Sequence, residues 1–256
     1  ITFNPLALPV IILAGLTPFI AWKRGALKQG FPALSPALVA ALLTGMGLVF
    51  YSLTRTAMPW LGIASLTAGA WLLAAMVVSL ADRIRLFDLP LRESGQRLRT
   101  LPLSYIGMWL AHMGLALLVI GAAALGTFQR EVQRPMQADD HLVLGDFTLH
   151  LEEVSYAQGP NYFTRRAHFA VYRAGKKLTV LYPENRLYPA EDTRTSEAAI
   201  YEGLFYDIYI ALGEVGEDEM LAVRAYFNPL VNRLWLGCLL MTLGGLLGAA
   251  AGFRRL

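Results

Sequence analysis

The sequence is short of cysteine and of charge. Its single cysteine, Cys238, excludes a disulfide within the chain, and the lack of any CxxCH pattern means that the chain is not itself a c-type cytochrome. Charged residues make up 16% of the 256 residues, against about 25% in soluble domains, and 55% are hydrophobic. This balance excludes a disordered chain and argues against a soluble enzyme.

The first residues also lack the pattern of a signal peptide. Residues 1–5 read ITFNP, with neither a methionine nor a basic stretch ahead of the first apolar run. We interpret the sequence as an internal piece of a longer membrane protein, or as one product of a split one.

Long apolar runs are what the sequence has instead. Five segments are long enough to cross a bilayer, which takes about 20 mostly apolar residues. They are expected at 6–22, 36–53, 59–81, 104–127 and 229–252. The predicted fold class is an α-helical integral membrane protein with about five transmembrane helices and an inserted small antiparallel β domain. Its predicted parts are residues 1–127, 128–228 and 229–256.

Acidic residues are scarce outside residues 128–228. That segment holds 16 acids and 10 bases, whereas the rest of the chain holds 3 acids and 12 bases. The basic pI of about 9.0 therefore does not indicate a nucleic-acid partner. Ten of the 12 bases fall in alternate connections between the spans or after the last span, the largest group being the arginines of 83–99. The positive-inside rule places these connections in the cytoplasm, and hence the chain start and 128–228 outside it.

Residues 128–228 show the short alternating runs of β-hairpins. Hairpins are predicted over 141–151, over 167–182 and between 204–212 and 220–227, which together indicate a small sandwich or barrel of underived strand order. No nucleophile paired with a base stands out, so we expect a binding platform. The histidines here, His141, His150 and His168, are expected to be solvated surface residues.

His112 is the one ionisable residue well inside any predicted span. Such a residue faces a protein interior, a cavity or a cofactor. Trp109 and Ala116 share its helix face, while an adjoining strip is made of small residues: Gly107, Ala111, Gly114 and Gly121. Neutral imidazole is a common axial ligand of haem iron. A haem ligand, a hydrogen bond to a neighbouring helix and a proton relay remain open alternatives at this point. The other ligand of such a haem would come from outside the chain or, less favourably, from a methionine.

Several segments together resemble a known family. They are residues 109–116 (WLAHMGLA) with Gly121, 183–189 (PENRLYP), 197–214 (EAAIYEGLFYDIYIALGE) and 226–230 (YFNPL). In this order they are similar to the carboxyl-terminal part of the CcmF family, the haem lyase subunit of the cytochrome c maturation system. The tryptophan-rich WWD segment and the other haem-ligating histidines of that family are absent from this sequence.

The resemblance implies a function and a set of partners. It implies that His112 is an axial ligand of a transmembrane b-type haem, beside which Trp109 and Ala116 are predicted to pack, and that quinol reduces this haem. A second haem, delivered by the chaperone CcmE, would be joined to the CxxCH cysteines of apocytochrome c. CcmG, CcmH and the remainder of the lyase are further implied partners, in the bacterial inner membrane with 128–228 on the periplasmic side. The alternative is a non-catalytic b-haem electron-transfer, haem-transport or scaffold subunit. No catalytic residue is assigned.

Overall fold

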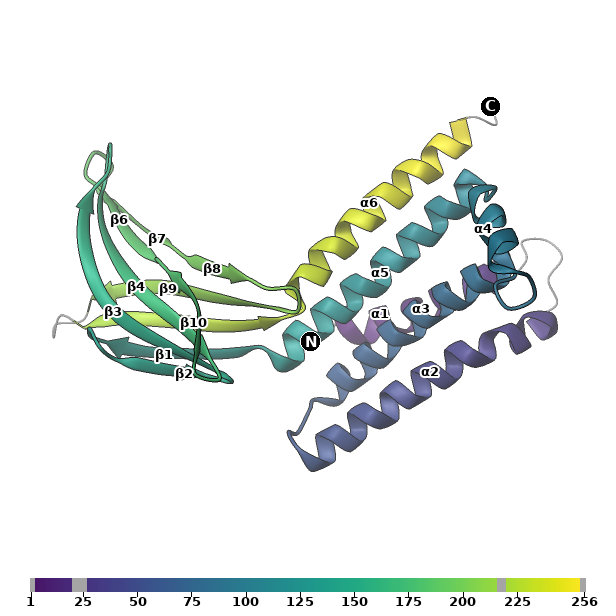
Figure 1. Ribbon diagram of the computed structural model, residues 1–256, viewed down its shortest axis with the longest axis horizontal. Coiled ribbons are helices and arrows are strands. Elements are labelled where there is room, and N and C mark those ends of the chain that lie inside the picture. Colours follow the sequence, from purple (N-terminus) through teal and green to yellow (C-terminus); the bar gives the residue numbers. More distant parts are fainter. Residues whose placement is uncertain (1–2, 20–26, 216–219, 254–256) are drawn as a thin grey trace. The chain divides into compact units, whose positions relative to one another are not determined.

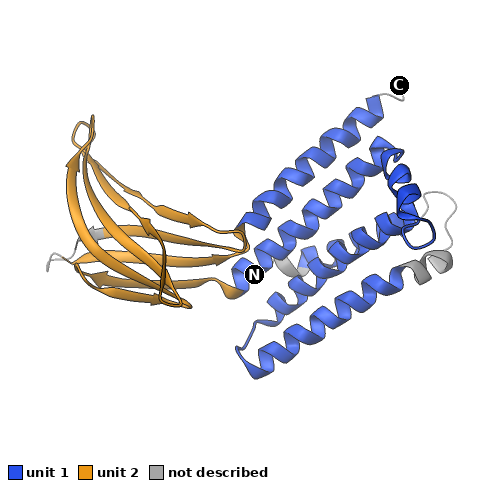
Figure 2. Ribbon diagram, viewed as in Figure 1, with its two compact units in different colours: residues 1–127, 232–256 blue, residues 128–231 orange. Residues whose placement is uncertain are grey.

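The computed structural model describes residues 3–19, 27–215 and 220–253. Its contacts divide the chain into two compact units (Figure 2). The helix unit comprises residues 1–127 and 232–256, and the β unit comprises residues 128–231. The β unit is therefore inserted, in sequence, between two helices of the other unit.

The helix unit contains long apolar helices (Figure 1). Its elements are α1 (Phe3–Leu16), the 3-10 turn η1 (Thr17–Phe19), α2 (Leu27–Thr54), α3 (Trp60–Ile84), α4 (Leu91–Arg99), α5 (Leu103–Phe128) and α6 (Val231–Phe253). In the described residues, four helices are long and apolar enough to cross a membrane: Leu34–Thr54 within α2, and the whole of α3, α5 and α6. These confirm four of the predicted spans.

The first predicted span, 6–22, has a shorter apolar helix in its place. The helix α1 gives way to η1 at Thr17, because Pro18 has no N–H to donate to the carbonyl of Ala14, four residues back. The hydroxyl of Thr17 donates to that carbonyl instead, at 2.7 Å. Residues 20–22 of the predicted span lie outside the described residues.

The β unit consists of antiparallel strands in two sheets, counted over its described residues. Sheet A has the order β1-β10-β9-β8, and sheet B has the order β2-β3-β4-β6-β7, with β5 also paired to β4. The bounds are β1 (Arg130–Met136), β2 (His141–Leu144), β3 (Phe147–Gln158), β4 (Phe163–Arg173), β5 (Lys176–Leu181), β6 (Glu184–Tyr188), β7 (Thr193–Glu197), β8 (Ala199–Glu202), β9 (Tyr206–Val215) and β10 (Leu221–Pro229).

All three predicted hairpins are present. They are β2–β3, β4–β5 and β9–β10, each paired antiparallel. Gly145 and Gly175 turn the first two hairpins with φ of 63° and 76°, in the left-handed region that glycine adopts without strain. The tip of the third hairpin, 216–219, lies outside the described residues.

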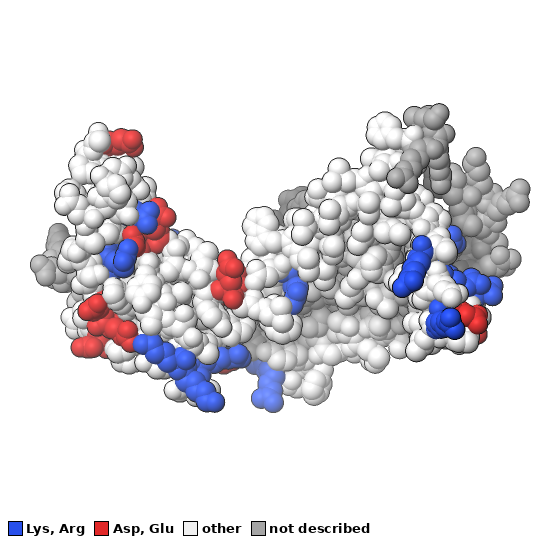
Figure 3. Space-filling model, turned by 45° about the horizontal axis from the view of Figure 1, so that its top comes forward, with Lys and Arg blue, Asp and Glu red and all other residues white. Residues whose placement is uncertain are grey.

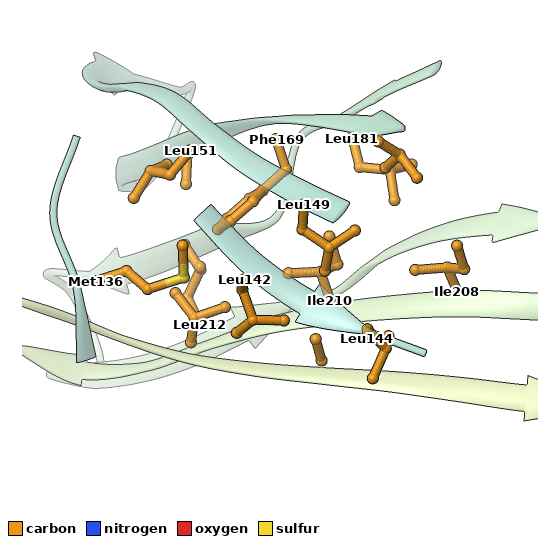
Figure 4. Packing of buried hydrophobic residues seen from close by; sticks show 14 of the residues in the cluster. Met136, Leu142, Leu144, Leu149, Leu151, Phe169, Leu181, Ile208, Ile210 and Leu212 are labelled. Carbon is orange, nitrogen blue, oxygen red and sulfur yellow. The ribbon is translucent and has the colours of Figure 1, made fainter. Parts of the chain in front are cut away.

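The core of the β unit lies between the two sheets (Figure 4). Leu149, Leu151 and Phe169 of sheet B and Ile208 and Ile210 of sheet A are all fully buried in one cluster. Alternation along each strand therefore sends these side chains inward, as expected of a sandwich. The amide of Gln129, just after α5, donates to the side-chain oxygen of Asn228 at 2.8 Å and ties the first strand to the last.

Glu184 anchors a network on the outer face of sheet B. Its carboxylate accepts hydrogen bonds from Arg166 (2.6 Å), Arg186 (2.9 Å) and Thr164 (3.1 Å). Burial acts to raise the pKa of Glu184, but these three donors outweigh it and hold the pKa below its usual range. Arg186 also lies over the ring of Tyr162, at 4.7 Å from the centroid. The 183–189 segment, noted for its family resemblance, therefore has a structural role.

Glu184→Gln is expected to lower the stability of the β unit by about 1–2 kcal/mol at neutral pH, because two partly solvated arginines lose a charged acceptor. Since the folded pKa is depressed, the contribution of Glu184 is present above the unfolded value of about 4.3 and lost as the pH falls below it. Thermal unfolding between pH 7 and pH 3 should thus show a smaller acid-induced loss in the variant. Glu191→Gln, which changes an exposed carboxylate in the turn before β7, is the matched control. An acid-induced loss equal to that of the wild type would contradict the assignment.

Candidate functional site

His112 lies in the middle of α5 and has one ring nitrogen committed to the backbone. Its Nδ1 is 2.9 Å from the carbonyl oxygen of Met108, one turn earlier. A carbonyl can only accept a hydrogen bond, so Nδ1 must carry the proton. In the neutral imidazole, the form that costs least in a membrane-length helix, Nε2 is then left with a lone pair.

The lone pair of Nε2 has no donor among the described residues. Its polar contact among those residues is with the hydroxyl oxygen of Thr17, at 3.4 Å. The single proton of that hydroxyl is already donated to the carbonyl of Ala14 at 2.7 Å. Two acceptors therefore face each other across a long contact. An unsatisfied nitrogen lone pair is what a metal ion coordinates, and its tautomer is set here by a backbone carbonyl, as in many ligating histidines.

Trp109 and Ala116, on the same face of α5, pack against other helices. The indole nitrogen of Trp109 donates to the carbonyl of Met76 on α3 at 2.9 Å. Ala116 is fully buried in a cluster with Leu72 of α3 and Ile11 of α1. Their predicted contact with a haem stays a prediction, since the structure accounts for both through helix packing. Trp71 of α3 is likewise buried, and its indole nitrogen donates to the carbonyl of Ile12 at 3.1 Å.

The strip of small residues on α5 faces α6. A Cβ atom built on Gly114 would lie 2.5 Å from the carbonyl oxygen of Gly237, and one on Gly244 would lie 2.5 Å from the amide nitrogen of Ala111. Only glycine allows two backbones to approach this closely. A second helix, α6, therefore packs directly against this strip of small residues.

The other histidines lie in the β unit. His141 and His150 face each other across β2 and β3 with their rings stacked at 4.1 Å. His168 lies 3.1 Å from Glu153 and 3.2 Å from the hydroxyl of Ser155. Within the described residues, no group of three or more His, Cys, Asp or Glu side chains could hold a metal ion.

Comparison with known proteins gives a consistent result. Residues 127–229 match the family described as the CcmF C-terminal beta-sandwich. The chain is 35% identical over 260 residues to the cytochrome c-type biogenesis protein ccl1 of Rhodobacter capsulatus, covering 99% of this chain and 38% of that protein. It is 33% identical over 245 residues to the cytochrome c-type biogenesis protein CcmF of Escherichia coli, covering 96% and 36%. The chain belongs to the CcmF family.

Within the CcmF family, this chain corresponds to the carboxyl-terminal part. It spans 38% and 36% of the lengths of the Rhodobacter and Escherichia relatives. A solved structure named cytochrome c haem lyase CcmF shares the fold over 95% of this chain and 38% of its own, with a TM-score of 0.71 at 18% identity. The predicted membership and the predicted fold class, apolar helices with an inserted antiparallel β domain, are both confirmed.

Sequence reasoning missed the part that Thr17 plays at this site. We treated residues 6–22 as one continuous span and assigned no role to Thr17 or Pro18. The signal was the Thr-Pro pair itself, because a proline frees the carbonyl four residues earlier and a neighbouring threonine hydroxyl can reach it.

Gly114→Ala is expected to destabilise the helix unit by about 1–3 kcal/mol, because the added methyl meets the backbone of α6 rather than a movable side chain. Thermal unfolding in lipid nanodiscs measures the effect. Gly126→Ala is the matched control: it lies on the same helix with nothing within 4 Å of its added methyl, so it should be neutral or slightly stabilising. Equal unfolding temperatures for the two variants would show that α5 and α6 do not pack this closely.

Proposed function

We propose that this chain is the haem-holding, carboxyl-terminal part of a cytochrome c haem lyase, with His112 as one axial ligand of a transmembrane b-type haem. One observation carries the proposal. His112 lies in a membrane-length helix, and the lone pair of its Nε2 has no hydrogen-bond donor among the described residues. Membership of the CcmF family supports it. The chain has no second histidine in an apolar helix, so the other ligand comes from a segment outside this sequence.

The residues around His112 would hold the ligand rather than react. The carbonyl of Met108 fixes the ring and its tautomer, and a hydrogen bond at Nδ1 makes Nε2 a better donor to iron. Trp109 and Ala116 fix α5 against α3 and so set the direction of the imidazole. A b-type haem bound there supplies one-electron redox chemistry, which the family resemblance connects to quinol.

The charges support a definite orientation in the membrane. Basic side chains gather over the end of the helix unit that carries α4 (Figure 3). They include Arg83, Arg85, Arg92, Arg97 and Arg99. The connection bearing them joins the end of α3 to the start of α5, whereas the β unit follows the end of α5. The proposed orientation therefore has α4 in the cytoplasm and the β unit in the periplasm, where CcmE, CcmG, CcmH and apocytochrome c are the proposed partners. The other bases used in this argument, at 23, 24, 28, 254 and 255, lie outside the described residues or have undescribed side chains.

Reporter fusions test the proposed orientation. A reporter that is active only in the periplasm should be inactive after Lys28 and after Gly95, and active after Gly175, because the bases near the first two sites resist translocation. Activity at Gly95, or inactivity at Gly175, would overturn the orientation. A cytoplasm-specific reporter at the same three sites should give the opposite pattern.

His112→Ala is expected to abolish b-haem binding while leaving the helix unit inserted, since alanine costs no more than histidine in lipid. The measurement is the haem absorption spectrum of the chain purified after co-expression with the amino-terminal remainder of a CcmF relative. His112→Gly should regain part of the signal with added imidazole, which fills the space that the ring leaves. His150→Ala, in the β unit, should leave the spectrum unchanged. An unchanged spectrum in His112→Ala would show that His112 is not a haem ligand and only makes a contact between helices.

A second assay separates a lyase part from a non-catalytic electron-transfer subunit. Thioether formation on a CxxCH peptide, with the remainder of the relative supplied, should require this chain and fail with His112→Ala. If haem binding requires His112 but thioether yield does not change, the chain has the electron-transfer or haem-transport role.

A further inference from the structure

One end of the β sandwich carries polar side chains on its inner face. In β4, the inward positions Ala167, Phe169 and Val171 are fully buried, and the next inward position in the same alternation is Arg165. Its cross-strand neighbours are Tyr156 in β3 and Asn185 in β6. The run of apolar side chains on the inner face of the sheet therefore ends at this row of residues.

The next row outward continues the change. Phe163 of β4 pairs with Leu187 of β6, which pairs with Arg194 of β7. Asn185 confirms that this face points inward, because its amide donates to the carbonyl of Gly213 in β9, across the sandwich, at 2.7 Å. These two rows and the end of β9 line a cavity of about 470 Å³, within the usual size of a small-molecule site.

Arg165 lines this cavity and has an orphaned donor. Its Nη2 is buried and has no hydrogen-bond partner among the described residues. The nearby carboxylates, Glu184 and Glu197, pair with Arg186 and lie on the other side of the sheet by the same alternation. A buried guanidinium nitrogen without a partner requires an explanation, and an acceptor brought by a ligand provides one.

The mouth of the cavity is apolar and aromatic. Tyr156 is 77% exposed and Phe163 is 50% exposed, although both belong to the inner face. We propose that this cavity binds an amphipathic carboxylate, whose acid group pairs with Arg165 and whose apolar body lies on Tyr156, Phe163 and Leu187. Arg194, on the same face two strands away, would take a second acid group. The site is separate from His112 and does not depend on it.

Titration with deuteroporphyrin IX tests the proposal. This metal-free dicarboxylate has no iron for His112 to bind, so the result is independent of the haem-ligand proposal. The full chain in nanodiscs should quench its fluorescence saturably, with empty nanodiscs as the blank. Arg165→Gln should weaken binding roughly tenfold and Arg165→Lys less, because lysine keeps the charge but loses the planar fork. The dimethyl ester, which lacks both acid groups, should not bind saturably.

Controls separate binding from folding. Arg134→Gln changes an exposed arginine of β1 and should leave affinity unchanged. Arg165→Gln should change the unfolding temperature little, because Nη2, the buried nitrogen that it removes, has no partner to lose. If that variant does unfold, Arg194→Gln on the exposed edge strand should still weaken binding. If dodecanoate displaces deuteroporphyrin IX, the cavity binds acyl carboxylates. If dodecanoate does not displace it, the cavity binds flat aromatic carboxylates. Equal affinity of acid and ester, or no effect of either arginine, would overturn the proposal.

Discussion

Hydrocarbon offers no hydrogen-bond partner, and the helix unit is organised by that constraint. Each polar group in an apolar helix must find its partner in the protein. Trp71 and Trp109 meet this requirement by donating to backbone carbonyls of neighbouring helices, and Thr17 by donating to the carbonyl that Pro18 leaves free. The same bonds join α1, α3 and α5. Among these groups only Nε2 of His112 is left without a donor, and this exception gives the site its chemistry.

The position of His112 also depends on the strip of small residues by which α5 packs against α6. Gly107 and Gly114 allow α6 to approach until backbone meets backbone, so α5 has little freedom to rotate about its axis. Rotation would move the imidazole away from Thr17 and out of the face that α3 covers. Packing of these small residues against α6 therefore fixes the direction in which the imidazole of His112 points. A substitution that separates α5 from α6 should therefore lower the stability of the helix unit and also misdirect the imidazole of His112.

Much of this fold was predictable from the sequence, because the signals were local. Length and apolarity predicted four spans, and alternation around Gly145 and Gly175 predicted two of the hairpins. The order of strands was not predictable, since β4 bonds to β3, β5 and β6 through contacts that no short segment encodes. His112 was identifiable as a residue type in an unusual place. Which nitrogen is free was not, because that depends on a carbonyl, a hydroxyl and a proline in two separate helices.

The two units also show why a polar residue in a sequence motif is ambiguous until its partners are known. Glu184 belongs to a motif of the CcmF family, yet its carboxylate is satisfied by three donors within the sheet, so its chemistry is used up in folding. Arg165, two strand positions from the end of the core, attracted no attention in the sequence, yet it keeps a buried donor unpaired. The difference lies in which face of the sheet each residue occupies, and that follows from register rather than residue type. Polar groups that have partners stabilise the fold. Two groups lack a partner, the acceptor Nε2 of His112 and the donor Nη2 of Arg165, and a ligand that paired with either would lower the free energy of the folded chain.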